Sequence, residues 1–214
     1  MDFIDIHTHQ QNRAENVFTI QNKYPTSVDF SKPFSIGIHP WFIKKESLQN
    51  ELLLIEEKLQ DKNCFALGEC GLDKISETDL TLQKIVFKKQ LELSEKYKKP
   101  LLIHCVKAYQ ELIEIKKEMK PTQTWVLHGF HKNSQVAESL LKNGVILSFG
   151  AGIINRKKLQ EVVFNIPISS ILLETDTAEI SIEKVYQKMA AIKNISLEEL
   201  KSEIKQNFKS IFKK

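Results

Sequence analysis

Two histidines separated by one residue, His7 and His9, follow a short apolar stretch near the start of the chain. Residues 3–6 are typical of a buried β-strand. Because side chains i and i+2 of a strand lie on the same face, the two imidazoles are expected to project together. Such a pair can share one metal ion. The alternative is a pair of histidines whose ring nitrogens are hydrogen-bonded to protein groups.

Other polar residues follow apolar stretches in the same way. Each lies at or just after the expected C-terminal end of a strand: His39, Glu69, His104, His128 and Asp176. In (β/α)8 barrels this end of the strands carries the chemistry. Each residue, taken singly, could also have a purely structural role. It could cap a helix, pair with a lysine, or be a core histidine that is hydrogen-bonded to the backbone. Their coincidence at strand ends favours a metal site.

The residue types also suit metal chemistry. Imidazole favours zinc and similar ions, whereas carboxylate favours magnesium or manganese, so the mixed set leaves the metal open. Two divalent cations about 3.5–4 Å apart can clamp the attacking and leaving oxygens at phosphorus and lower the pKa of a bound water. An aspartate at the last strand, Asp176, could ligate one ion and accept the proton of that water.

These side chains require a scaffold of alternating strands and helices. Apolar runs predict strands at 3–6, 34–38, 64–67, 101–103, 125–127, 145–149 and 171–173, and a weaker one at 17–20. Helical periodicity predicts helices near 47–62, 78–97, 107–119, 134–142, 155–163, 181–192 and 196–212. Short apolar runs alternating with helices indicate a parallel sheet covered on both sides. We therefore predict one domain over residues 1–214, a shortened (β/α)8 TIM-type barrel with its metal site at the C-terminal end of the strands.

Composition is ordinary for a soluble globular protein of 214 residues, with 27% charged and 42% hydrophobic residues. The net charge of +4 permits a nucleic-acid partner without indicating one. Cys64, Cys70 and Cys105 show no CxxC spacing and are expected to be reduced thiols acting as small hydrophobes. No signal peptide or membrane span is expected, which predicts a cytoplasmic protein without a membrane partner.

The ordered motifs resemble those of the TatD-type metal-dependent deoxyribonucleases, an amidohydrolase-like group of (β/α)8 barrels, over residues 3 to about 212. The resemblance rests on the stretches His-Thr-His at 7–9, Gly-Ile-His-Pro at 37–40, Gly-Glu-Cys-Gly-Leu-Asp at 68–73, the His104 strand, His-Gly-Phe at 128–130 and Glu-Thr-Asp at 174–176. It implies two divalent ions bridged by Glu69. His7, His9 and Asp176 would complete the shell of one ion, and His104 and His128 that of the other.

The resemblance also implies roles in catalysis and in holding the ligands. Asp176 would act as the base, and Glu69 would contribute to catalysis through the metal site. Four further residues are expected to hold ligands or face the substrate: His39, Asp73, Lys107 and Glu174. Asp73 is expected to brace its loop, and Glu174 to orient a ligand.

Several positions depart from the family pattern. Trp41 follows the Gly-Ile-His-Pro stretch where the family usually has a histidine or similar polar group. The family's His-x-Arg is His104-Cys105-Val106 here, which removes an arginine expected to contact phosphate and leaves only Lys107 nearby. The loops after residues 9 and 176 are also shortened, so hydrolase activity is predicted more securely than nuclease activity.

The predicted function is therefore that of a metal-dependent hydrolase of ester bonds, acting as a phosphodiesterase or deoxyribonuclease on DNA or oligonucleotides with a two-metal-activated water. The first alternative is hydrolysis of small phosphoester, amide or ester substrates on the same barrel. The second is a barrel that binds a ligand without turnover.

Overall fold

The strands of the protein alternate with helices through most of the chain. The computed structural model describes residues 2–10 and 14–212. Within them the strands are β1 (Phe3–Thr8), β2 (Val17–Lys23), β3 (Phe34–Ile36), β4 (Cys64–Asp73), β5 (Leu101–Val106), β6 (Trp125–Leu127), β7 (Val145–Phe149) and β8 (Ile171–Leu173). The α-helices are α1 (Leu48–Lys58), α2 (Leu80–Tyr97), α3 (Tyr109–Met119), α4 (Ser134–Lys142), α5 (Gly152–Asn155), α6 (Lys157–Asn165), α7 (Ile182–Lys193) and α8 (Leu197–Ile211). Two short 3-10 helices are η1 (Pro40–Phe42) and η2 (Ile168–Ser170).

The strands follow one another in the sheet in chain order, from β1 to β8. The pairs β1–β2, β3–β4, β4–β5 and β7–β8 are parallel. Parallel strands in chain order, connected through helices from β3 onward, are the pattern of a TIM-type (β/α)8 barrel, which confirms the predicted fold class. The weak strand expected at 17–20 is also confirmed, as part of β2.

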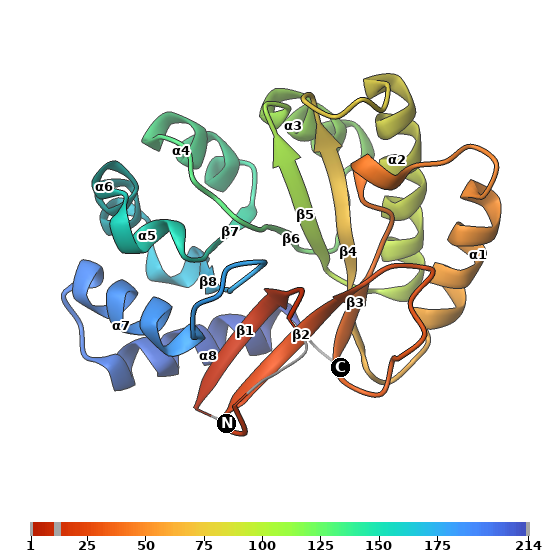
Figure 1. The fold of residues 1–214 in the computed structure, drawn as a ribbon. Coiled ribbons are helices and arrows are strands. Elements are labelled where there is room, and N and C mark those ends of the chain that lie inside the picture. The colour runs from red at the N-terminus through yellow and green to blue at the C-terminus, as the bar shows by residue number, and fades with distance from the viewer. Residues whose placement is uncertain (1, 11–13, 213–214) are drawn as a thin grey trace. The chain divides into compact units, whose positions relative to one another are not determined.

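The chain divides into two compact units. The terminal unit consists of Met1–Gln21 and Leu127–Lys213, and the central unit of Asn22–Val126. In the central unit, α2 packs along β4 (Figure 1). Phe34, Phe87 and Trp125 are fully buried there, so large apolar side chains fill the space between helix and sheet.

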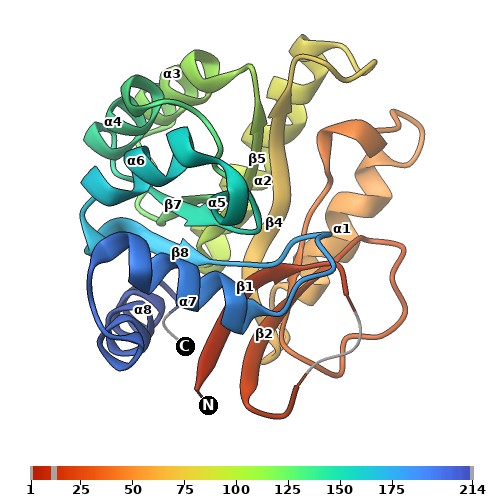
Figure 2. The same cartoon turned by 60° about the vertical axis from the view of Figure 1, so that its left-hand side comes forward.

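In the terminal unit, α7 and α8 pack against each other and against β1, as Figure 2 shows in blue and red. The buried Tyr186 of α7 donates its hydroxyl to the carbonyl of Ile4 and accepts from the amide of Ile4, each at 3.1 Å. Its ring also meets Phe3 edge-on, with the centroids 5.1 Å apart. These contacts fix the strand that ends at His7 and His9.

Five predicted strand ends are wrong. The strands expected at 3–6, 17–20 and 101–103 continue to Thr8, Lys23 and Val106. The strand expected to end at Leu67 continues to Asp73, so Glu69 lies within β4 rather than in a loop after it. The strand expected at 34–38 ends at Ile36.

Two glycines, Gly68 and Gly71, explain why β4 is longer than expected. At Gly68 and Gly71, φ is 145° and 143°, and an added Cβ would overlap the carbonyl oxygens of Leu102 and His104 on β5. Only glycine permits this close pairing at such angles.

Among residues 2–10 and 14–212, no helix is both long enough and apolar enough to cross a membrane. The same residues contain no helix between β1 and β3. This agrees with the irregular, proline-bearing sequence of that segment.

Candidate metal centre

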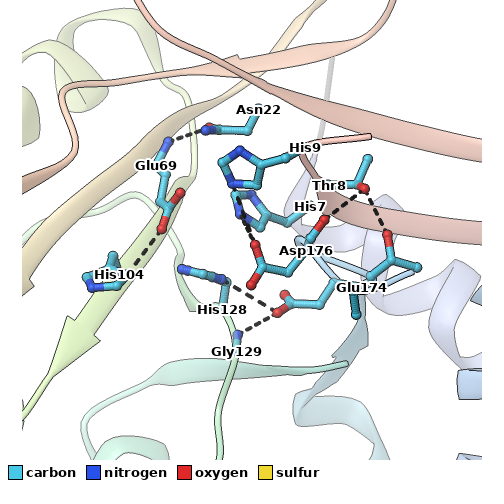
Figure 3. A network of polar contacts seen from close by, with 12 residues as sticks. His7, Thr8, His9, Asn22, Glu69, His104, His128, Gly129, Glu174 and Asp176 are labelled. Carbon is cyan, nitrogen blue, oxygen red and sulfur yellow. Dashed lines mark hydrogen bonds and ion pairs between the residues drawn. The ribbon is translucent and has the colours of Figure 1, made fainter. Parts of the chain in front are cut away.

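The terminal unit brings His7, His128 and Asp176 together at the ends of β1, β6 and β8. One potential ligand atom from each lies within 4.8 Å of the other two. The Nε2 atom of His7 is 3.6 Å from Oδ1 of Asp176, and the rings of His7 and His128 are 4.4 Å apart between centroids (Figure 3). We refer to these three residues as the terminal group.

His9 lies beside the terminal group. Its Nε2 atom is 3.5 Å from the same Oδ1 atom of Asp176 that faces His7. The two imidazoles therefore point toward one carboxylate, as expected for residues i and i+2 of a strand. Asp176 itself is fixed by its backbone, because its amide donates to the carbonyl of His7 at 2.9 Å.

Buried carboxylates support the terminal group. Glu174 is fully buried, and its Oε1 atom accepts from the amide of Gly129 at 2.6 Å and lies 3.6 Å from Nδ1 of His128. Asp5 accepts from the amide and hydroxyl of Thr175 at 3.0 and 2.7 Å. Burial raises the pKa of Asp5 to about 7, even though the bonds from Thr175 lower it. Sequence reasoning overlooked Asp5, although an acidic residue within a buried strand is itself a signal of a bonded network.

The central unit gathers His39, Glu69 and His104, which again offer one ligand atom each within 4.8 Å. Oε1 of Glu69 lies 3.3 Å from Nε2 of His39 and 3.1 Å from Nδ1 of His104. His39 and Glu69 are each 5% exposed, so this cluster is nearly dry. We call these residues the central group.

Asp73 and Trp41 hold His104 from the other side of its ring. Oδ2 of Asp73 lies 2.9 Å from Nε2 of His104 and accepts from Nε1 of Trp41 at 2.7 Å. Burial would raise the pKa of Asp73, but bonds from His104, Ile75 and Trp41 outweigh it and hold the pKa below its ordinary value. Both ring nitrogens of His104 therefore face carboxylates, Nε2 that of Asp73 and Nδ1 that of Glu69.

Buried amides position the backbone of the central group. Asn22 accepts from the amide of Glu69 at 3.0 Å through its Oδ1 atom. Gln90 bonds both the amide and the carbonyl of Ile38, at 2.8 and 3.2 Å, and so fixes the segment that leads to His39. Sequence reasoning missed both residues. The signal for Gln90 was a polar residue on the apolar face of a predicted helix.

The positions of His39 and Lys107 bear on their expected roles in holding ligands or facing the substrate. His39 was expected to hold a ligand or face the substrate, and it lies among potential ligands itself. Lys107 is exposed and adopts a left-handed conformation, with φ 53°, directly after β5.

The three cysteines are buried free thiols, in agreement with their expected role as small hydrophobes.

The donor sets of both groups fit a divalent cation. Each combines two imidazoles with one carboxylate, a set used by zinc and by neighbouring transition metals. Each also has a histidine whose far nitrogen faces a buried carboxylate, Glu174 at His128 and Asp73 at His104. Metal-binding histidines are usually oriented in this way.

Comparison with known proteins gives the family. Residues 3–213 match the family described as TatD related DNase. The chain belongs to this family. Several relatives are named metal-dependent hydrolases, which agrees with the donor groups described above. The predicted family resemblance is thereby confirmed.

Two curated relatives illustrate the range of the family. A Buchnera aphidicola (subsp. Baizongia pistaciae) protein named uncharacterized metal-dependent hydrolase is 35% identical over 196 residues, which cover 83% of this chain and 73% of that protein. A Vairimorpha ceranae protein named putative deoxyribonuclease TATDN1 homolog is 29% identical over 168 residues, covering 77% of this chain and 60% of its own length.

A nuclease relative and a solved structure complete the comparison. The human protein named 3'-5' RNA nuclease TATDN2 is 34% identical over 149 residues, which are 66% of this chain and 19% of that protein. The crystal structure of YjjV, a TatD homolog from Escherichia coli K12, has a TM-score of 0.85 at 21% identity and covers 99% of this chain and 98% of its own. This likeness supports the barrel fold.

Proposed function

We propose that this TatD-family hydrolase cleaves phosphodiester bonds in DNA or short oligonucleotides, using one divalent cation at each donor group. The observation that carries the proposal is that each of two sets of His and carboxylate ligand atoms lies within 4.8 Å. The names of two relatives, a putative deoxyribonuclease and an RNA nuclease, support a nucleic-acid substrate. Zinc, magnesium and manganese are the candidate ions.

Each cation would be held by residues of one unit. The terminal group with His9 would bind one cation, and the central group the other. This differs from the assignment implied by family resemblance, in which His128 joins His104 and His39 is not a ligand. The bridging role expected of Glu69 remains a prediction.

A cation bound by such ligands lowers the pKa of its water and stabilises charge on phosphate oxygens. The protein's own part is to place ligands and to accept a proton. The side chain of Asp176 is 35% exposed, and its Oδ1 atom is already 3.6 and 3.5 Å from two imidazoles. It can therefore reach solvent and accept a proton from the attacking water, while Glu174 keeps the ring of His128 oriented.

A second candidate is hydrolysis of small phosphoester, amide or ester substrates. The specific observation that favours it is the sequence Cys105-Val106 after His104, which lacks the arginine expected to contact a phosphate backbone. Arginine is the side chain best suited to bidentate phosphate contacts. Its absence weakens the case for a long polyanionic substrate.

Cleavage assays with added Mn²⁺, Zn²⁺ or Mg²⁺ separate these functions. The substrates are a labelled DNA oligonucleotide, a generic phosphodiester and a generic ester. We expect oligonucleotide cleavage, and a loss of about a hundredfold or more in Asp176→Asn and in Glu69→Ala. Glu57→Gln, a change at an exposed carboxylate of α1, is the matched control and should keep full activity. Cleavage of the small substrates alone would reject the nuclease function. Equal activity of Asp176→Asn and wild type in every assay, with metal still bound to the variant, would favour a barrel that binds a ligand without turnover.

A further inference from the structure

Trp41 is held rigidly and yet remains exposed. Its Nε1 atom donates to Oδ2 of Asp73 at 2.7 Å, and that oxygen lies 2.9 Å from Nε2 of His104. The indole meets the rings of His39 and His104 nearly edge-on, at 85° and 74°. The residue is nevertheless 54% exposed. A rigid aromatic ring therefore stands beside the central group with much of its surface open to solvent.

An open cavity of about 730 Å³ lies against this ring. Trp41 from η1 and Ile75 from the segment after β4 line it, and Ile75 is 61% exposed. The volume is within the range of small-molecule sites, which is about 300–1,000 Å³. Trp41 and Ile75 together present apolar surface to this hollow.

The charges around the cavity indicate what it would accept. Lys44 and Lys45 line it together with three acidic residues, Glu46, Glu77 and Asp79. The acidic side chains outnumber the basic ones, so a phosphate group gains little there. A neutral heterocycle with both donors and acceptors suits this mixed lining, and its flat face suits the indole.

We propose that this cavity binds a nucleobase of the substrate, stacked on Trp41. The inference rests on the proposed function, since it names the part of a nucleic acid that lies next to the central group. Trp41 stands where the family usually has a histidine or similar polar group, so the subsite distinguishes this chain from that pattern. With the phosphate-contacting arginine missing, stacking would supply affinity that charge does not.

Intrinsic fluorescence can report on this site, because the chain has two tryptophans and the other one is buried. Trp125 is 0% exposed, with Nζ of Lys116 lying 4.6 Å from its ring centroid. The ligands are a pentanucleotide and an abasic pentanucleotide with the same number of phosphates, both in EDTA so that cleavage does not occur. We expect the base-bearing strand to quench the emission and to bind about tenfold or more tightly than the abasic strand.

Variants separate the aromatic ring from its hydrogen bond. Trp41→Ala is expected to raise the Kd of a labelled pentanucleotide, measured by anisotropy, by about tenfold or more. Trp41→Phe keeps a ring but loses the bond to Asp73, and its Kd should stay within about threefold of wild type. Phe164→Ala removes a ring of equal exposure from α6 and is the matched control. Circular dichroism establishes that each variant is folded.

The outcomes distinguish this inference from the function on which it rests. Equal binding of abasic and base-bearing strands, or an unchanged Kd in Trp41→Ala, would overturn the stacking site even if wild type cleaves DNA. Base-dependent binding without cleavage under any cation would instead overturn the nuclease function alone. If neither strand binds to wild type, the stacking site is overturned, and the cleavage assay with added cation alone decides the nuclease function.

Discussion

Asp73 and His104 form a contact that holds one edge of the histidine ring. Oδ2 of Asp73 lies 2.9 Å from Nε2, while Nδ1 lies 3.1 Å from Glu69. Asp73 therefore acts on the central group through His104, without itself belonging to that group. The same arrangement recurs in the terminal unit between Glu174 and His128.

Asp73→Asn is expected to weaken divalent-cation binding at the central group by about 10- to 100-fold. The amide carries no charge and can turn an N–H toward Nε2, which would weaken the contact that orients the ring. Titration calorimetry with Mn²⁺ or Zn²⁺ measures the change. Asp29→Asn, at an exposed carboxylate bonded to Ser31, should bind cations like wild type. An unchanged affinity in Asp73→Asn would show that this contact does not orient His104.

Glu69→Ala should reduce the number of bound cations from two to one per chain. Oε1 of Glu69 is the atom that faces both His39 and His104, so its loss removes the central carboxylate but leaves the terminal group intact. Elemental analysis after dialysis against the metal gives the count. A double substitution, His128→Ala with Asp176→Asn, should leave the other cation bound. Loss of both ions in Glu69→Ala would instead support the bridging role implied by the family.

Gly71→Ala should lower the free energy of unfolding by about 3 kcal/mol or more. The residue has φ 143°, and its new Cβ would overlap the carbonyl oxygen of His104 on β5. Gly144→Ala is the matched control, since its φ is 69° but no atom lies within 4 Å of the added Cβ. We expect a cost of about 1 kcal/mol for the control. Urea unfolding measures both, and equal losses would show that the close approach of β4 and β5 is not what requires glycine.

The ion pair between Lys74 and Glu111 predicts a small acid-dependent loss of stability. Nζ and Oε1 are 2.5 Å apart, and the bond from Lys74 holds the pKa of Glu111 below its ordinary value. A carboxylate whose pKa is lower in the folded state than in the unfolded state adds stability at pH values above its unfolded-state pKa. That stability disappears as the pH falls through its folded-state pKa. Glu111→Gln should therefore cost about 0.5 kcal/mol at pH 7 and nothing near pH 2.

Thermal or urea unfolding across this pH range tests the sign of the effect. Glu57→Gln changes a carboxylate whose side chain is 64% exposed and serves as the comparison, with little change at either pH. A difference between wild type and Glu111→Gln that grows toward low pH would contradict the assignment.

The strand–helix order was predictable because each strand is a short apolar run and each helix has an amphipathic period. The strand expected at 145–149 has the bounds of β7, for example. Strand ends were harder to predict where glycines intervene. Gly68 and Gly71 suggest a loop, since glycine disfavours strands in general. In the structure they permit β4 to continue, because β5 approaches too closely for any side chain.

The candidate ligands were predictable by residue type and position, but their partners were not. Trp41 appeared only as a departure from the family, whereas its indole nitrogen bonds Asp73. Asn22 carried no local signal, because a single asparagine at the end of a weak strand does not reveal that its carbonyl oxygen meets the amide of Glu69. Such bonds join residues 32 and 47 positions apart, and only folded geometry shows them.

The three residues of the terminal group lie in the terminal unit, and the three residues of the central group lie in the central unit. Retention of each ion would then depend first on the local stability of the elements that carry these ligands. On gradual heating or chelation the protein would release its cations one after the other. A half-loaded, inactive species would be populated on the way to the metal-free form.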